Sequence, residues 1–148
     1  MIVPADFTAR VATLVGTPFR IKGDDRDGWD CRGCGRWIYR NILGVAVEDY
    51  RDAYEASGFS TATGRARRAH VIAERLAAWR PVAVQAGAIV QLTWLGRSGH
   101  VGVMLDRRCF IHADQGVGTT IADLADRACA YRPVGWFVPS YVTEVLHG

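Results

Sequence analysis

The order of the hydrophobic patterns constrains this sequence most, because helical spacing fills the first half and strand-like runs fill the second. Apolar residues recur at helical spacing over residues 4–15, between Pro4 and Gly16, and again over residues 31–43 and 48–79. Runs rich in Val, Ile, Phe and Trp then predict strands at residues 87–95, 100–105, 109–113 and 131–138. Helices followed by strands predict an α+β fold, with N-terminal helices packed on a C-terminal antiparallel β-sheet.

Length and composition bound the number of domains and the class of protein. The 148 residues fit one domain over residues 1–148, and a composition of 49% hydrophobic and 22% charged residues is typical of a globular chain. No apolar run approaches the roughly 20 residues that span a bilayer, and residues 1–19 lack the features of an export signal. We therefore expect no membrane insertion, and reduced cysteines in the cytoplasm after synthesis.

The charge distribution argues against direct nucleic-acid binding. The net charge is only +3, and the basic residues are scattered except for Arg65, Arg67 and Arg68. A protein that binds a phosphate backbone usually carries a continuous basic stripe. We expect no nucleic acid among the partners of this chain.

Cys31 is the first candidate for chemistry. Asp30 is suited to cap a helix over residues 31–43, which would place the Cys31 thiol at a helix N-terminus, where the dipole and free amides favour a thiolate and an oxyanion. Gly33 and Gly35 each weaken such a helix by about 1 kcal/mol, so they indicate that another backbone or a substrate approaches its first turn. The alternative is that Cys31 is simply a small buried side chain.

The second candidate is a hairpin over residues 100–114. The apolar residues of its two strands share one core face only if the loop is odd, such as residues 106–108. This register sets Gly102 opposite His112 and makes His100 and His112 diagonal neighbours, with Cβ atoms less than about 8 Å apart. Such imidazoles can act as a base and its orienting partner; two unrelated, half-exposed histidines are the alternative.

Three segments together resemble a known family: DCRGCGRWIYR at residues 30–40, GHVGVML at 99–105 and FIHA at 110–113. They resemble the NlpC-type family of papain-like cell-wall peptidases, whose usual pattern is Asp-Cys-Ser-Gly, then His-Val-Gly, then an apolar pair followed by His and Ala. The resemblance extends upstream through GTPFRIKG and DGWDC and covers nearly the whole chain.

The resemblance implies a compact papain-like fold and a cysteine endopeptidase. In that scheme Cys31 is the nucleophile, His100 is the general base and acid, and His112 orients His100. The implied substrate is a peptidoglycan stem peptide, typically cleaved between the γ-carboxyl of D-glutamate and a diamino acid. No cofactor or metal is implied.

Two positions depart from the family pattern. Arg32 follows the expected nucleophile where Ser is usual, a departure that resembles tail-associated phage members and implies an altered cleft. Phe19 aligns with an aromatic that is often a Tyr, whose hydroxyl is assigned to the oxyanion site. Losing such a donor can cost about 10² to 10³ in rate and would leave the Cys31 amide, with or without a neighbouring group, to bind the oxyanion. We expect Phe19, Arg32, Trp29 and Asp30 to border the substrate groove.

Cys31 and Cys34 form a CxxC motif, which also suggests redox or zinc chemistry. A thioredoxin-like site would follow a first strand, whereas a helix and a loop precede this motif. A closed zinc site with His100 and His112 is conceivable. However, Cys34 lies on the inward stripe of its helix and is better interpreted as a core residue, like Cys109 and Cys129.

The strongest rival function is a structural component without turnover. Free-standing wall hydrolases of the family resemble secreted proteins with a signal peptide and binding modules, and neither is visible here. This fits members built into phage tails or gene-transfer particles, which are made in the cytoplasm and act in the periplasm or cell wall of the recipient. Such a chain needs a tail or baseplate partner, which we expect at residues 48–79 with their arginine group.

Overall fold

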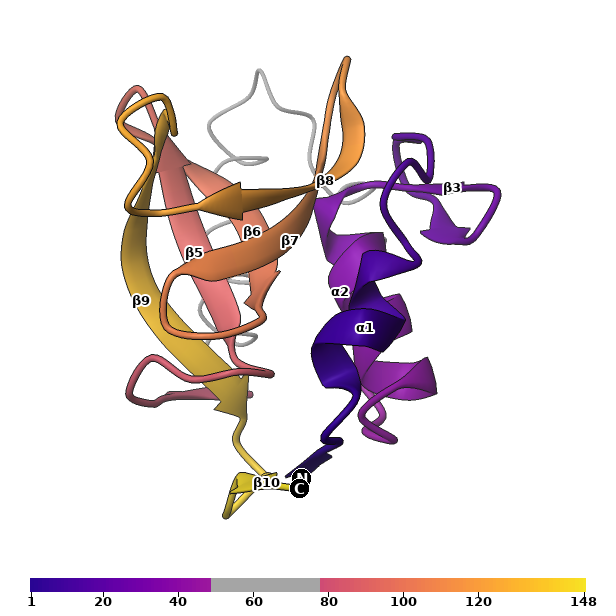
Figure 1. Ribbon diagram of the computed structural model, residues 1–148, viewed down its shortest axis with the longest axis vertical. Coiled ribbons are helices and arrows are strands. Elements are labelled where there is room, and N and C mark those ends of the chain that lie inside the picture. The colour runs from indigo at the N-terminus through magenta and orange to yellow at the C-terminus, as the bar shows by residue number, and fades with distance from the viewer. Residues whose placement is uncertain (49–77) are drawn as a thin grey trace, which may run out of the picture.

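The computed structural model describes residues 1–48 and 78–148, in which two helices stand beside a curved antiparallel sheet (Figure 1). The helices are α1 (Phe7–Ala12) and α2 (Cys31–Asn41). The sheet contains β4 (Trp79–Pro81), β5 (Ile89–Trp94), β6 (Arg97–Met104), β7 (Cys109–Asp114), β8 (Gly118–Asp123) and β9 (Tyr131–Pro139). Short strands are β1 (Ile2–Val3), β2 (Asp24–Asp25), β3 (Gly28–Trp29) and β10 (Leu146–His147). Within the described ranges, no helix is long and apolar enough to cross a bilayer.

The strands of the main sheet follow the order β4-β9-β5-β6-β7-β8, and all neighbours are antiparallel. Strands β1 and β10 pair in parallel, which brings the two ends of the chain side by side (Figure 1). Helices precede the sheet in sequence and pack on it, so the predicted α+β arrangement is confirmed.

Helix α2 begins and ends close to the predicted residues. Asp30 adopts an extended conformation and its side chain accepts from the Gly33 amide, as expected for an N-cap. The helix ends at Asn41, two residues earlier than predicted, and Gly44 follows in a left-handed conformation with φ of 66°. Helix α1 is shorter than the predicted 4–15, because its last turn continues with i→i−3 bonds rather than α-helical ones.

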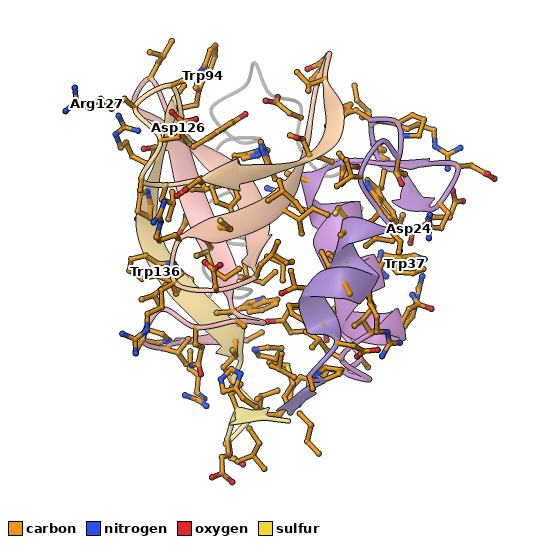
Figure 2. The ribbon with its side chains drawn as sticks, in the orientation of Figure 1. Asp24, Trp37, Trp94, Asp126, Arg127 and Trp136 are labelled. Atoms are coloured by element: carbon orange, nitrogen blue, oxygen red, sulfur yellow. The ribbon has the colours of Figure 1, made fainter. Side chains whose placement is uncertain are left out.

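Two apolar clusters lie on opposite faces of the sheet. The first joins the helices to the sheet; it includes Ile38 and Tyr39 of α2 with Val103 and Ile111 of the sheet. The second contains Val90, Leu92, Met104, Phe110 and Val138, and the segments after β4 and β9 cover it. Two tryptophans follow the same division, since Trp37 is part of α2 and packs on the first cluster, whereas Trp136 of β9 packs on the second (Figure 2). Both faces of β6 and β7 are therefore buried.

The hairpin has the predicted register. Val103 pairs with Ile111, Met104 pairs with Phe110, and the Leu105 amide donates to the Cys109 carbonyl at 2.8 Å. The loop is therefore residues 106–108, and the same register sets Gly102 opposite His112.

Strands β4 and β8 were not predicted. Trp79 begins β4 instead of ending a helix, which corrects the prediction of helix up to that residue. The rest of the predicted 48–79 region, including Arg65, Arg67 and Arg68, lies outside the described residues.

Candidate active site

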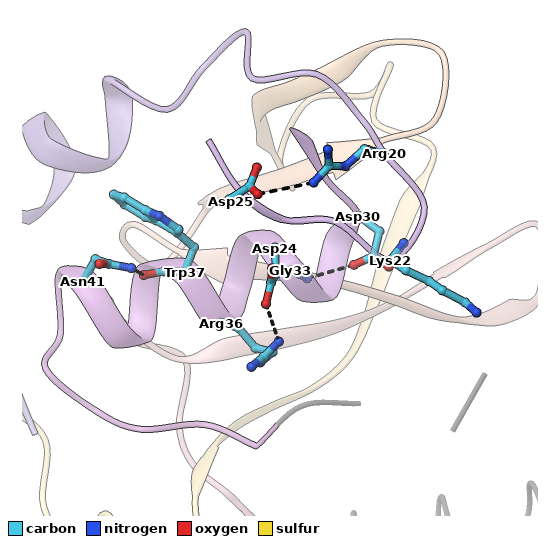
Figure 3. A network of polar contacts seen from close by, with 9 residues as sticks. All are labelled: Arg20, Lys22, Asp24, Asp25, Asp30, Gly33, Arg36, Trp37 and Asn41. Carbon is cyan, nitrogen blue, oxygen red and sulfur yellow. Dashed lines mark hydrogen bonds and ion pairs between the residues drawn. The ribbon is translucent and has the colours of Figure 1, made fainter. Parts of the chain in front are cut away.

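Asp30 holds the start of α2 through both oxygens of its carboxylate (Figure 3). The Gly33 amide donates to Oδ1 at 2.8 Å, and the Lys22 amide donates to Oδ2 at 3.1 Å. The Cys34 amide donates to the Asp30 carbonyl at 3.0 Å. Cys31 is therefore the first residue of a well-capped helix.

The preceding loop packs directly against this first turn. A β-carbon on Gly33 would lie 1.9 Å from the Gly23 carbonyl oxygen, so only glycine fits there. Arg36 of α2 pairs with Asp24 of the loop at 2.9 Å (Figure 3). The close approach predicted at Gly33 is thus made by another part of the backbone.

The Cys31 thiol is buried beside the strand that carries His100. Its side chain is only 9% exposed, and the backbone amides of Val101 and Arg32 donate toward it. Burial raises the pKa of the Cys31 thiol, and these amides and the Arg32 charge offset the rise only in part. Desolvation therefore favours the neutral thiol, in contrast to the sequence-based expectation that the helix terminus favours a thiolate.

His100 and His112 form a hydrogen-bonded pair. His100 Nε2 lies 2.8 Å from His112 Nδ1, and the rings meet edge to face with centroids 5.0 Å apart. The predicted diagonal contact is confirmed. Because Nε2 of His100 is engaged, Nδ1 is the ring nitrogen left to meet another group.

Burial keeps both imidazoles of this histidine pair neutral at pH 7. It lowers the pKa of His100 to about 4, with a smaller contribution from His112, and it also lowers the pKa of His112. The charge of Asp114 acts in the opposite direction on both rings. The free site therefore holds a neutral thiol and two neutral imidazoles.

Three further side chains surround the histidine pair. Tyr131 stacks on His100, Phe110 packs on His112, and the Tyr131 hydroxyl donates to Asp114 Oδ2 at 2.8 Å. Sequence reasoning missed Tyr131 and Asp114. Strand alternation could have found Asp114, which is two residues after His112, whereas no local signal pointed to Tyr131.

The four residues expected to border the substrate groove fall into two groups. Trp29 has no exposed surface, and its Nε1 donates to Thr119 Oγ1 at 2.7 Å; Asp30 is occupied as a helix cap. Both side chains support the loop. The full burial of Trp29 corrects the expectation that it borders the groove, whereas for Asp30 that expectation stays a prediction. Phe19 and Arg32 are half-buried, and their predicted substrate contacts stay predictions.

Cys34 packs in the core. It is 1% exposed, lies in the cluster between α2 and the sheet, and burial raises the pKa of its thiol. Within residues 1–48 and 78–148, no three His, Cys, Asp or Glu side chains gather closely enough to hold a metal ion. Cys109 and Cys129 are half-buried and pack against the two apolar clusters.

Several solved structures share this fold. The NlpC/p60 domain of the peptidoglycan hydrolase SagA is 22% identical with a TM-score of 0.57, over 88% of this chain and 94% of that chain. An NLP/P60 family protein from Staphylococcus aureus, described as similar to lipoprotein, is 19% identical with a TM-score of 0.56, over 88% of this chain but 39% of that chain. An NlpC protein from Trichomonas vaginalis is 18% identical with a TM-score of 0.55, over 88% and 45%. The chain thus spans less than half the length of the last two.

No curated protein sequence matches the chain significantly. The sequence model of the NlpC/P60 family, in contrast, matches residues 16–136, a range that includes Cys31, His100 and His112. Together with the shared papain-like fold, this match shows that the chain belongs to the NlpC/P60 family of cysteine peptidases and peptidoglycan hydrolases.

Proposed function

We propose that this chain is a cysteine endopeptidase that hydrolyses peptidoglycan stem peptides at the bond between the D-glutamate γ-carboxyl and a diamino acid. Cys31 is the nucleophile, His100 is the base and acid, and His112 orients His100. The hydrogen bond between the two imidazoles carries this proposal, together with a cysteine that begins a helix and lies at the amide of Val101, the residue after His100.

The first half of the reaction starts from the neutral thiol. As the Cys31 sulfur attacks the substrate carbonyl carbon, its proton moves to Nδ1 of His100, and a C–S bond forms. The C–N bond then breaks, and the His100 imidazolium gives its proton to the departing amine. A thioester on Cys31 and a free amine are the products of this half.

The second half releases the enzyme. His100, again neutral, takes a proton from water as the oxygen attacks the thioester carbonyl. The C–S bond breaks, the proton returns to the Cys31 sulfur, and a carboxylic acid leaves. His112 keeps Nδ1 of His100 directed at the reacting atoms during both halves, because it engages Nε2.

Oxyanion stabilisation falls to the backbone at the start of α2. The Gly33 and Cys34 amides are engaged by Asp30, and the Arg32 amide donates toward the thiol. We assign the oxyanion to the Cys31 amide, which replaces the hydroxyl that Phe19 cannot supply.

A second candidate function keeps the fold without turnover. The small exposed fraction of Cys31, 9%, and the raised pKa of its thiol favour a catalytically weak or inactive docking component. In either form we propose that the chain is made in the cytoplasm, carried on the tail or baseplate of a phage-like particle, and placed in the periplasm or cell wall of the recipient during DNA delivery. The sequence resemblance at Arg32 supports this context.

The decisive experiment compares wild type, Cys31→Ala and Cys34→Ala on defined muropeptides, with products identified by mass. Cys34→Ala is the matched control, because it removes a buried thiol from the same helix. We expect Cys31→Ala to lose at least about 10³-fold in rate and Cys34→Ala to keep turnover, with no effect of a strong chelator. Equal absence of products from all three proteins across several pH values would count against turnover and favour the docking component.

The carrier context is tested separately. Purified particles from a producing strain are analysed by quantitative mass spectrometry after tails are separated from heads. The proposal expects the chain in the tail fraction in a fixed ratio to tail proteins. Its absence from that fraction would remove the tail from the proposal and leave the peptidase unaffected.

A further inference from the structure

We propose that Tyr131 and Asp114 are positioning residues that hold the His100–His112 pair in its hydrogen-bonded arrangement. This inference rests on the proposed role of His100 as base. Neither residue belongs to the motifs that carry the family resemblance. Both act through the histidines, and no contact with substrate is assigned to them.

Tyr131 covers both rings of the pair at once. Its ring is stacked on His100 with centroids 4.6 Å apart and planes inclined by 20°. It meets His112 edge to face, with centroids 5.0 Å apart and planes inclined by 76°. Because the Tyr131 ring contacts both imidazoles, it restricts rotation about their terminal side-chain torsions, which are otherwise broad and two-fold.

Asp114 anchors Tyr131 from the other side of the site. Tyr131 is the first residue of β9 and Asp114 is the last residue of β7, and two strands, β5 and β6, lie between them in the sheet. The 2.8 Å bond from the Tyr131 hydroxyl to Asp114 Oδ2 therefore links strands that share no backbone bonds, across the face that carries the histidines. This hydrogen bond restrains the position of the Tyr131 ring relative to the two imidazoles.

The charge of Asp114 adds an electrostatic role. Asp114 raises the pKa of both histidines, so it stabilises the imidazolium that forms when His100 takes the thiol proton. Among the described residues, the other ionisable groups that bear on the site include the histidines themselves, Asp30 and Arg32 around the Cys31 thiol, and Cys31 and Cys129 near the Tyr131 phenol. Desolvation of the imidazoles opposes their protonation, so the Asp114 carboxylate partly offsets the effect of burial on the histidine pair.

The test uses a readout that needs no turnover. Side-chain ¹⁵N NMR of the full chain reports the tautomer and the pKa of each imidazole in wild type, Tyr131→Leu, Tyr131→Phe and Asp114→Asn. Tyr141→Leu is the matched control, because Tyr141 is an exposed tyrosine on the segment after β9. We expect one tautomer of His100 in wild type and in the control, and mixed tautomers in Tyr131→Leu.

The two milder variants distinguish the effect of the Tyr131 ring from that of its hydrogen bond to Asp114. Tyr131→Phe keeps the stack and should keep one His100 tautomer with broadened signals. Asp114→Asn keeps an acceptor for the tyrosine but removes the charge, so the pKa of both histidines should fall. If Tyr131→Leu does not fold, these two variants decide the proposal. Unchanged tautomers and unchanged pKa values of the pair in all variants would overturn it.

Kinetics on muropeptides then connects positioning to the reaction. Tyr131→Leu should lower kcat by about 10- to 100-fold while KM changes by less than about threefold. The substitution misaligns the reacting groups but leaves the contacts that bind substrate in place. Absence of turnover in wild type would defeat the proposed function alone, since the NMR result still decides the positioning role. Wild-type kcat in Tyr131→Leu would overturn the positioning role alone.

Discussion

Gly33 lies in the first turn of α2, where the Gly23 carbonyl oxygen occupies the place of a β-carbon. Helix propensity alone would favour alanine at this position by about 1 kcal/mol. Packing overrides that preference, because the neighbouring atom is backbone and cannot rotate away. A β-carbon on Gly35, in the same helix, would lie 3.3 Å from Cδ1 at the flexible end of Ile89.

We therefore predict that Gly33→Ala destabilises the protein by about 2–4 kcal/mol, measured by urea unfolding. Gly35→Ala is the control and should change the free energy of unfolding by less than about 1 kcal/mol, because Ile89 can adjust. Equal stabilities of the two variants would mean that the loop before α2 moves freely away from the helix.

Arg32 provides the second prediction at the scale of one residue. Its charge lowers the pKa of the Cys31 thiol, against the dominant effect of burial. Arg32→Ser should raise the pKa of Cys31 and slow alkylation by iodoacetamide at pH 7 by about 2- to 10-fold, whereas Arg32→Lys should retain most of the rate. An alkylation rate unchanged in Arg32→Ser would exclude this electrostatic role.

The β6–β7 hairpin is the element that brings the two histidines together. Asp106 stabilises its three-residue loop, because Oδ1 accepts from the Arg108 amide at 2.6 Å and from the Cys109 amide at 2.7 Å. Both bonds are exposed, so their contribution to stability is modest. Their larger effect is on the register that sets His112 beside His100.

We predict that Asp106→Ala lowers the free energy of unfolding by about 1 kcal/mol and increases hydrogen exchange of the β6–β7 amides. Asp106→Asn keeps the acceptor oxygen and should resemble wild type. Exchange that increases equally in both variants would show that the charge, and not the turn hydrogen bonds, stabilises the loop.

The elements that sequence patterns missed share a physical cause. Strand β8 begins at a glycine and carries Thr119 and Thr120, so its alternation is weak, and it lies at the edge of the sheet beside β7. Strand β4 has three residues and ends at Pro81. Both strands exist because a neighbouring strand offers hydrogen bonds, which is a property of the assembled sheet.

At the scale of the molecule, the sheet is buried on both faces where the histidines lie. This burial keeps the pair neutral: the pKa of His100 falls to about 4, below the value of about 6.5 in an unfolded chain. Between these two values the unfolded chain binds more protons than the folded one. The contribution of neutral His100 to the free energy of unfolding is therefore fully present above about pH 6.5 and decreases as the pH falls toward about 4.

We predict that the free energy of unfolding falls by on the order of 2 kcal/mol between about pH 7 and about pH 4.5, after discounting for the partial exposure of His100. His100→Gln should flatten this dependence, while His147→Gln, at an exposed histidine, should leave it as in wild type. An identical slope in wild type and His100→Gln would show that other groups cause the acid sensitivity.

The motif residues were predictable because each depends on a local pattern. Asp30 capping requires only its place before α2, and the contact between His100 and His112 follows from strand alternation and an odd loop. The role of Trp29 was misjudged for the opposite reason. Its neighbour Thr119 comes from another segment of the chain, and a sequence pattern does not show which side chains that segment covers.

The sequence by itself determined the start of α2, the register of the β6–β7 hairpin and the family. Capping and alternation act over a few residues, so they can be read without the fold. Only the tertiary structure decided that Cys31 is a neutral buried thiol and that Tyr131 and Asp114 enclose the histidines. Desolvation and contacts between separate strands arise when distant segments pack together, and no local pattern encodes them.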